Sequence, residues 1–171
     1  MSTETTPSRL PAKYVAEMIA LAGPDLCVAT PCGILAPLLG ELAGVHRNFG
    51  YVHREDNAVA LAAGVAMAGR RAVVLMQNSG LGQSVNVLAS LVEPFRPPIG
   101  LVISLRGTGQ DTTRENRSMG HITEPLLDHF DIPWRPIGRQ SLEWFDDCLE
   151  SRTGPAALLV PPEFFGWSAS K

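Results

Sequence analysis

The strongest constraint on the fold is a pair of apolar runs, residues 72–76 and 98–105, that lack the polar alternation of a half-exposed strand. Strands of this kind are covered on both faces, which is typical of parallel sheets. Further short apolar runs alternate with segments of helical periodicity, and Gly, Pro, Asn or Asp marks most of the changes. The sequence therefore predicts an α/β fold with three layers, α/β/α, around a mainly parallel sheet of roughly six strands. We expect strands at residues 25–29, 49–53, 72–76, 98–105, 132–137 and 156–160, and helices at residues 8–22, 34–42, 84–92, 121–130 and 141–152, with one more between His53 and Gly69.

The length of the chain indicates a single domain, and its charge limits the classes of partner. A chain of 171 residues without a long linker is expected to form a single domain over residues 1–171, with an ordered core at about 9–162, a polar N-terminal tail and an aromatic C-terminal tail. The net charge of -3 comes without a basic stripe, so we expect no nucleic-acid partner. The most apolar run, residues 58–69, is too short to cross a bilayer, and the polar start does not resemble a signal peptide, so we expect a cytoplasmic protein. Cys27, Cys32 and Cys148 lack zinc-ligand spacing and are expected to be buried free thiols, and no metal site is predicted in this chain.

Four chemically unusual segments follow the expected strands: residues 30–33, 53–57, 77–82 and 106–120. In open parallel sheets, ligands bind outside the carboxyl ends of the strands, where such segments meet. We therefore expect the functional site at this edge.

The segment HREDNAVALAAG places ionisable residues directly before a helix built almost wholly from small apolar residues. Glu55, Asp56 and Asn57 stand where a helix cap and first-turn acids are common, so a purely local role is one interpretation. A helix so rich in Ala and Gly also lets another group pack very close to it. The segment QNSGLGQS, residues 77–84, is predicted to be a turn that leaves a buried strand and leads into a helix. It matches neither the dinucleotide fingerprint nor a Walker loop, and a polar turn without a ligand would look similar.

Together, these two segments make a family resemblance visible. The stretch HREDNAVALAAGVAMAGRRAVVLMQNSGLGQSVNVLASL resembles the pyrimidine-binding domain of thiamine-diphosphate enzymes, and within them the sulfopyruvate and phosphonopyruvate decarboxylases. The turn Thr-Pro-Cys-Gly at residues 30–33 and the run Gly-His-Ile-Thr at residues 120–123 are also similar to elements of these enzymes. The resemblance implies a flavodoxin-like three-layer fold and thiamine diphosphate as the cofactor.

The resemblance also implies site residues. In these enzymes a glutamate at the place of Glu55 hydrogen-bonds N1' of the aminopyrimidine, which favours the imino form that removes the C2 proton. Glu55 is thus the expected catalytic residue, and His53 beside it is a candidate proton carrier that also has a packing or solvent-facing interpretation. The residues expected to line the pyrimidine pocket with Glu55 are Asn78, Ser79, Gly80 and Gly82, with Asn86 a weaker candidate that is equally explained by capping or packing.

One family element is missing from the chain. The motif that holds Mg²⁺ and the diphosphate in these enzymes begins with Gly-Asp-Gly, which occurs nowhere in the sequence. The resemblance therefore implies a partner, a β subunit that carries the diphosphate domain and Mg²⁺, in an α2β2 or larger assembly.

The long segment at residues 106–120 contains three Arg and leads to a His. A small 2-oxoacid with a sulfonate or phosphonate group calls for such donors, so Arg106, Arg117 and His121 are the substrate-binding candidates. A solvated loop whose Arg residues pair with Asp111 and Glu115 is the alternative. The predicted function is the α subunit of a decarboxylase that converts 3-sulfopyruvate to sulfoacetaldehyde and CO2. The alternatives are a phosphonopyruvate decarboxylase subunit, giving phosphonoacetaldehyde, and a non-catalytic flavodoxin-like binding or regulatory module.

Overall fold

A computed structural model describes residues 9–168, which form one six-stranded sheet in the order β2-β1-β3-β4-β6-β5. Every pair of neighbouring strands is parallel. This confirms the predicted α/β class and the mainly parallel sheet. The strands are β1 (Leu26–Ala29), β2 (Phe49–Tyr51), β3 (Ala72–Gln77), β4 (Ile99–Ser104), β5 (Trp134–Pro136) and β6 (Ala156–Val160).

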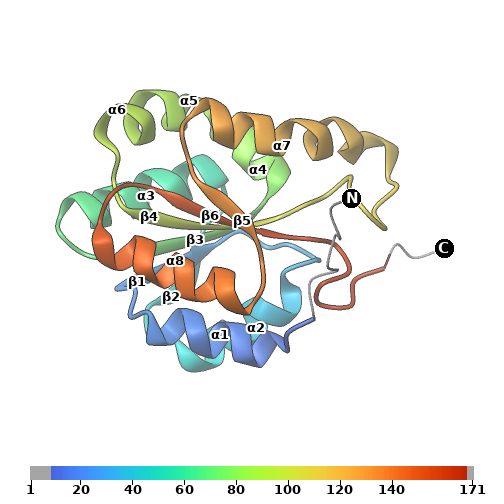
Figure 1. Cartoon of the computed structure of the whole chain (residues 1–171), viewed down its shortest axis with the longest axis horizontal. Coiled ribbons are helices and arrows are strands. Elements are labelled where there is room, and N and C mark those ends of the chain that lie inside the picture. Colours follow the sequence, from blue (N-terminus) through green and yellow to red (C-terminus); the bar gives the residue numbers. More distant parts are fainter. Residues whose placement is uncertain (1–8, 169–171) are drawn as a thin grey trace.

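Helices cover both faces of the sheet (Figure 1). One face carries α1 (Ala12–Leu21), α2 (Ala36–Val45) and α8 (Arg139–Ser151), and the other carries the remaining helices. These are α3 (Glu55–Met67), α4 (Asn78–Gln83), α5 (Val85–Val87), α6 (Glu93–Phe95) and α7 (Arg117–His129), with a π-helical turn η1 (Leu88–Val92) and a 3-10 turn η2 (Arg114–Asn116).

The central strands explain the lack of polar alternation. Along β3, Val73 and Leu75 belong to the core on the α1/α2/α8 face, whereas Val74 and Met76 belong to the core on the α3/α7 face. All four side chains are fully buried. Successive residues of a strand point to opposite faces, so two covered faces require an apolar residue at every position.

Two segments differ from the predictions. Residues 77–82, predicted to be a turn, are mostly helical, because α4 begins at Asn78 directly after β3. Residues 106–120, predicted to be a loop, end in helix, because α7 begins at Arg117. The sequence did not predict these helical residues because Gly80 and Gly120 have low helix propensity. Glycine is present because close packing at each position leaves no room for a side chain.

The helical segment after α4 is irregular near its end. The helix predicted at residues 84–92 is present as α5 and η1 and continues into α6. Pro94 lacks a backbone N–H, and its ring would collide with the carbonyl of Ser90 in a regular α-helix. The π-helical turn that contains Ser90 widens the helix at this point.

The aromatic segment after β6 packs on the chain's own core. Phe164 is buried in the core on the α1/α2/α8 face, and Phe165 and Trp167 pack against it. This segment therefore contributes to the carboxyl edge of the sheet.

Within residues 9–168, no helix is both long enough and apolar enough to cross a membrane.

Candidate functional site

The site lies where the strand order reverses. The chain leaves β1 towards the edge strand β2, through α2 on one face, and leaves β3 towards β4, through helices on the other face. The connections after these neighbouring strands diverge at their carboxyl ends, which opens a crevice in doubly wound folds. Thr30 follows β1 at this point and Asn78 follows β3.

Glu55 is placed at this crevice by three elements. It is the first residue of α3 and is half-buried. The hydroxyl of Thr30 donates a hydrogen bond to its Oε1 at 3.1 Å. On the α4 side, Gly80 lies so close that a Cβ there would be 2.2 Å from Glu55 Cγ and 2.8 Å from Oε1. Within residues 9–168 no hydrogen bond is formed to Oε2, which leaves this oxygen available to a ligand.

The charged residues on either side of Glu55 in the sequence, Arg54 and Asp56, pair with each other. Asp56 accepts two hydrogen bonds from the Arg54 guanidinium, at 2.8 and 3.1 Å, and one from the Asn57 amide at 2.9 Å. The hydrogen bond from Arg54 lowers the pKa of the Asp56 carboxyl, although partial desolvation opposes it. The capping expectation is therefore met only in part: Asp56 binds one first-turn amide, whereas Arg54 occupies the cap position and has no side-chain cap bond.

Asn78 connects three elements beneath the crevice. Its side chain is fully buried, and its amide donates to the Arg106 carbonyl at 2.9 Å and to the Thr123 hydroxyl at 3.1 Å. Its Oδ1 accepts the Arg106 backbone N–H at 3.2 Å. These bonds join the carboxyl ends of β3 and β4 to α7. They give Asn78 a structural task, and its expected contact with a cofactor stays a prediction.

The other residues predicted for the pyrimidine pocket are spread along α4 and beyond. Ser79 is half-buried, and Gly82 is so close to α7 that a Cβ would be 2.9 Å from Met119 Cε. Gly80 makes room for Glu55, so its structural effect on the site is exerted through that carboxylate. Asn86 and His53 are both exposed. Their roles remain predictions.

A buried carboxylate organises the segment after β4. Asp111 is 2% exposed and accepts hydrogen bonds from Arg106 Nε at 2.8 Å, the Gly107 amide at 3.0 Å and Asn116 Nδ2 at 3.0 Å. Burial raises the pKa of Asp111, but hydrogen bonds from Thr113 and Gly107, with the charge of Arg106, outweigh it and lower the pKa to about 2. The pairing of Arg106 with Asp111 was the alternative interpretation of this segment, and for Arg106 the structure shows that pairing.

Two of the three substrate-binding candidates share one pocket. Arg117 and His121 are one turn apart on α7, and both line a pocket of about 340 Å³ with Gly107, Thr108, Gly109, Asp111 and Thr112. Arg106 lies beside this pocket, with its guanidinium over the Trp167 ring at 4.9 Å from the centroid. The structure thus gathers cationic side chains and hydroxyls at the carboxyl end of β4, a donor set that suits an anionic group.

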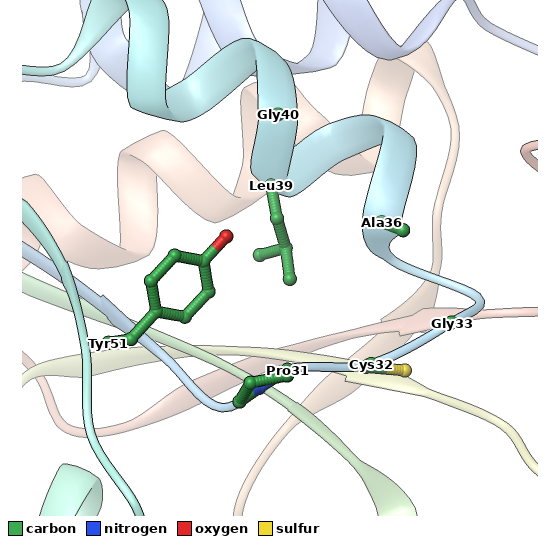
Figure 2. A pocket seen from close by; sticks show the side chains of 7 residues that line it. All are labelled: Pro31, Cys32, Gly33, Ala36, Leu39, Gly40 and Tyr51. Carbon is green, nitrogen blue, oxygen red and sulfur yellow. The ribbon is translucent and has the colours of Figure 1, made fainter.

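A second pocket, of about 470 Å³, lies at the carboxyl ends of β1 and β2. Figure 2 shows Leu39 reaching down from α2 beside the Tyr51 ring, whose hydroxyl points towards that helix, with Pro31 and Cys32 along the opposite side. The Cys32 thiol is within 3.1 Å of the Ser104 hydroxyl, so it bridges the ends of β1 and β4. This pocket is mostly apolar and is separate from the one lined by Arg117.

Several residues of this edge were not identified from the sequence. The sequence indicates Thr30 only as part of a turn. Neither its bond to Glu55 nor the stacking of Trp167 on Arg106 has a local sequence signal, since the partners are 25 and 61 positions apart. For Asp111 the sequence indicates only pairing with arginine in a solvated loop, whereas the carboxylate is buried. Within residues 9–168 no group of three or more His, Cys, Asp or Glu side chains is placed to hold a metal ion.

No family model matches the chain. The sulfopyruvate decarboxylase subunit alpha of Methanothermobacter thermautotrophicus is 40% identical over 146 residues, which cover 81% of this chain and 88% of the relative. The corresponding subunit of Methanocaldococcus jannaschii is 38% identical over 154 residues, covering 86% of this chain and 90% of the relative. A phosphonopyruvate decarboxylase of Streptomyces viridochromogenes is 34% identical over 81% of this chain, but the match covers 37% of that longer protein.

Solved structures agree on the fold. A benzoylformate decarboxylase from Polynucleobacter necessarius matches with a TM-score of 0.65 at 15% identity, over 94% of this chain and 32% of that chain. A thiamine diphosphate-dependent 4-hydroxybenzoylformate decarboxylase from Rhodococcus jostii matches with a TM-score of 0.63 at 20% identity, over 95% of this chain and 32% of that chain. The fold is therefore that of one domain of thiamine-diphosphate enzymes. By its identity to relatives that it covers almost completely, the chain belongs to the family of sulfopyruvate decarboxylase alpha subunits.

Proposed function

We propose that this chain is the alpha subunit of a thiamine-diphosphate-dependent decarboxylase that converts 3-sulfopyruvate to sulfoacetaldehyde and CO2. The observation that carries the proposal is the half-buried carboxylate of Glu55, held at the carboxyl ends of β1 and β3 with Oε1 bound by Thr30. The names of the relatives support the substrate. The longer phosphonopyruvate decarboxylase, at 34% identity, supports phosphonopyruvate as the alternative substrate.

The residues present fit the pyrimidine half of the cofactor. Within residues 9–168, Oε2 of Glu55 has no hydrogen-bond partner, and it can hydrogen-bond a ring nitrogen when a proton is shared between the two. When bound, thiamine diphosphate supplies the carbanion that adds to the ketone and accepts the electrons released with CO2. The task of Glu55 is to share a proton with N1' of the aminopyrimidine, and Ser79 and Gly82 would border the same ring.

The diphosphate and Mg²⁺ require another polypeptide in this proposal. The chain contains no Gly-Asp-Gly motif, and its relatives of similar length are named as alpha subunits. The matched region covers 37% of the longer phosphonopyruvate decarboxylase, so that protein has room for a second domain on the same chain. A β subunit with the diphosphate domain, in an α2β2 or larger assembly, is therefore the proposed partner.

The pocket lined by Arg117 and His121 is the proposed site for the sulfonate end of the substrate. Arg117 and His121 are one turn apart on α7, and Thr108 and Thr112 also line the pocket, although the Thr108 hydroxyl already donates to the Leu105 carbonyl at 3.0 Å. Sulfonate has three acceptor oxygens and suits several donors at once. Arg106 would take part through those nitrogens of its guanidinium that Asp111 does not bind.

The test is reconstitution of the chain with the β subunit, thiamine diphosphate and Mg²⁺, followed by measurement of CO2 release from both acids. We expect turnover of 3-sulfopyruvate with a kcat/KM higher than that of phosphonopyruvate. The reverse preference would reassign the substrate. No turnover of either acid by an intact complex would favour a non-catalytic module.

A further inference from the structure

Thr30 fixes one oxygen of the proposed catalytic carboxylate. Its hydroxyl donates to Glu55 Oε1 at 3.1 Å, and the residue is 4% exposed. Its backbone N–H is bonded to the Leu75 carbonyl at 3.1 Å, which continues the pairing of β1 with β3. The donor is therefore attached to the backbone pairing of two central strands, directly at the crevice.

Gly80 restricts the same side chain from a second direction. A Cβ at Gly80 would be 2.2, 2.6 and 2.8 Å from Cγ, Cδ and Oε1 of Glu55, and both Gly80 and Thr30 are buried. A carboxylate held by a hydrogen bond on one oxygen and by contact along its stem has few rotamers left. Oε2, to which no hydrogen bond is formed within residues 9–168, is then the oxygen left for a ligand.

We propose that Thr30 is a positioning residue that holds Glu55 Oε1 so that Oε2 meets the aminopyrimidine ring in a fixed geometry; this rests on the proposed role of Glu55. A side chain within bonding reach of its target contributes to the rate only if its orientation is held, and errors of about 1 Å can cost about 100-fold. Thr30 does not contact the reacting atoms. It acts through Glu55 alone.

The test compares two substitutions in the complex with the β subunit. Thr30→Val keeps the shape of the side chain and removes the donor, whereas Thr30→Ser keeps the donor and removes a methyl group. We expect Thr30→Val to lower both kcat and the rate of C2–H exchange of bound cofactor, followed by NMR, by about tenfold. We expect the KM for the oxoacid and the Kd for thiamine diphosphate to stay within about threefold, and Thr30→Ser to recover most of the exchange rate. Thr153→Val, in the exposed link between α8 and β6, is the matched control.

A double-mutant cycle separates this inference from the proposed function. If Thr30 acts through Glu55, Thr30→Val should have no further effect on C2–H exchange in the Glu55→Gln background. No turnover by the complex with the natural chain would contradict the proposed function itself, whereas full exchange and turnover in Glu55→Gln would contradict the proposed role of Glu55. A slow Glu55→Gln enzyme combined with an unchanged Thr30→Val enzyme would overturn only the role of Thr30. Equal losses in Thr30→Val and Thr30→Ser, with a matching fall in Tm, would show a packing role and would also overturn it.

Discussion

At the scale of single residues, the position of Glu55 depends on the absence of a side chain at Gly80. The sequence shows an acid before a small-residue helix and, separately, a glycine-containing segment after a buried strand. Only the fold shows that the two are in contact, because Glu55 and Gly80 are 25 positions apart. The resemblance to thiamine-diphosphate enzymes predicted both residues as members of the site. It did not show that Gly80 serves Glu55.

Replacing Gly80 should therefore impair the site more than the fold. In Gly80→Ala the new Cβ would overlap Glu55 Cγ at 2.2 Å, so the half-buried carboxylate must swing out of the crevice. We expect kcat of the reconstituted complex to fall by about tenfold or more, with little change in Tm of the chain.

Gly44→Ala is the matched control, because Gly44 is also helical and a Cβ there meets nothing within 4 Å. It should stabilise the chain by about 0.5–1 kcal/mol without loss of turnover. Equal activity of the two variants would show that Glu55 does not need its observed position.

At the scale of elements, the segment between β4 and α7 is ordered by one buried carboxylate. Asp111 gathers donors from Arg106, Gly107 and Asn116, and Gly120 on α7 packs so close that a Cβ would be 2.5 Å from the Gly107 carbonyl oxygen. Gly107 also has a φ of 76°, which favours glycine. Gly107 and Asp111 also line the pocket that contains Arg117 and His121.

The pH dependence of stability should reveal Asp111. Its pKa in the folded chain is lowered to about 2 from 3.8, so its contribution is present above about pH 4 and is lost as the pH falls towards 2. We expect Asp111→Asn to be less stable than the natural chain at pH 6 by about 2 kcal/mol in urea unfolding. The difference should shrink as the pH falls from 4 towards 2, because the natural carboxyl becomes protonated over this range.

Asp147→Asn, on the exposed side of α8, is the control for Asp111→Asn and should show no such convergence. A difference between Asp111→Asn and the natural chain that stays constant from pH 6 to pH 2.5 would contradict the assigned ion pair.

The proposed sulfonate site makes a prediction about substrate affinity. Arg117→Ala removes a guanidinium from the pocket at the start of α7, and we expect the KM for 3-sulfopyruvate to rise by about tenfold or more with a smaller effect on kcat. Arg114→Ala, three residues earlier on η2, is the matched control, because Arg114 does not line that pocket. Equal KM values for Arg117→Ala and the natural chain would remove this pocket from the substrate site.

The elements that sequence analysis missed share one physical cause. Strands and most helices were predictable because burial on two faces leaves a periodic apolar pattern in the sequence. The starts of α4 and α7 were not, since Gly80, Gly82 and Gly120 signal turns locally. Glycine occupies these helical positions in spite of its low helix propensity, because a Cβ there would collide with Glu55, Met119 or Gly107. The bond of Thr30 to Glu55 was likewise unpredictable, because it joins segments that only the strand order brings together.

At the scale of the whole molecule, the proposed function makes the carboxyl edge of the sheet half of a site. This edge presents Glu55 at the point between β1 and β3 and, beyond β4, the pocket proposed for the sulfonate. It presents no Gly-Asp-Gly motif for a diphosphate and its metal ion. The family relationship to alpha subunits agrees with this division.

The chain alone should therefore bind thiamine diphosphate poorly. We expect calorimetry to show a Kd about 100-fold higher for the isolated chain than for the complex, a difference of about 2.7 kcal/mol, because most contacts to the diphosphate and Mg²⁺ would be absent. The Kd of the β subunit alone for thiamine diphosphate, measured in the same way, is the comparison for both values. Tight binding and decarboxylation by the isolated chain would contradict the proposed division of the site.

The proposed mechanism depends on a proton that Glu55 shares with the cofactor. Glu55→Gln keeps the size of the side chain and its contact with Thr30 and Gly80 but removes the carboxylate. In the reconstituted complex, single-turnover measurement of CO2 release from 3-sulfopyruvate should show a rate lower by about 100-fold or more, with the cofactor still bound. A Glu55→Gln complex that releases CO2 at nearly the natural rate would contradict the account.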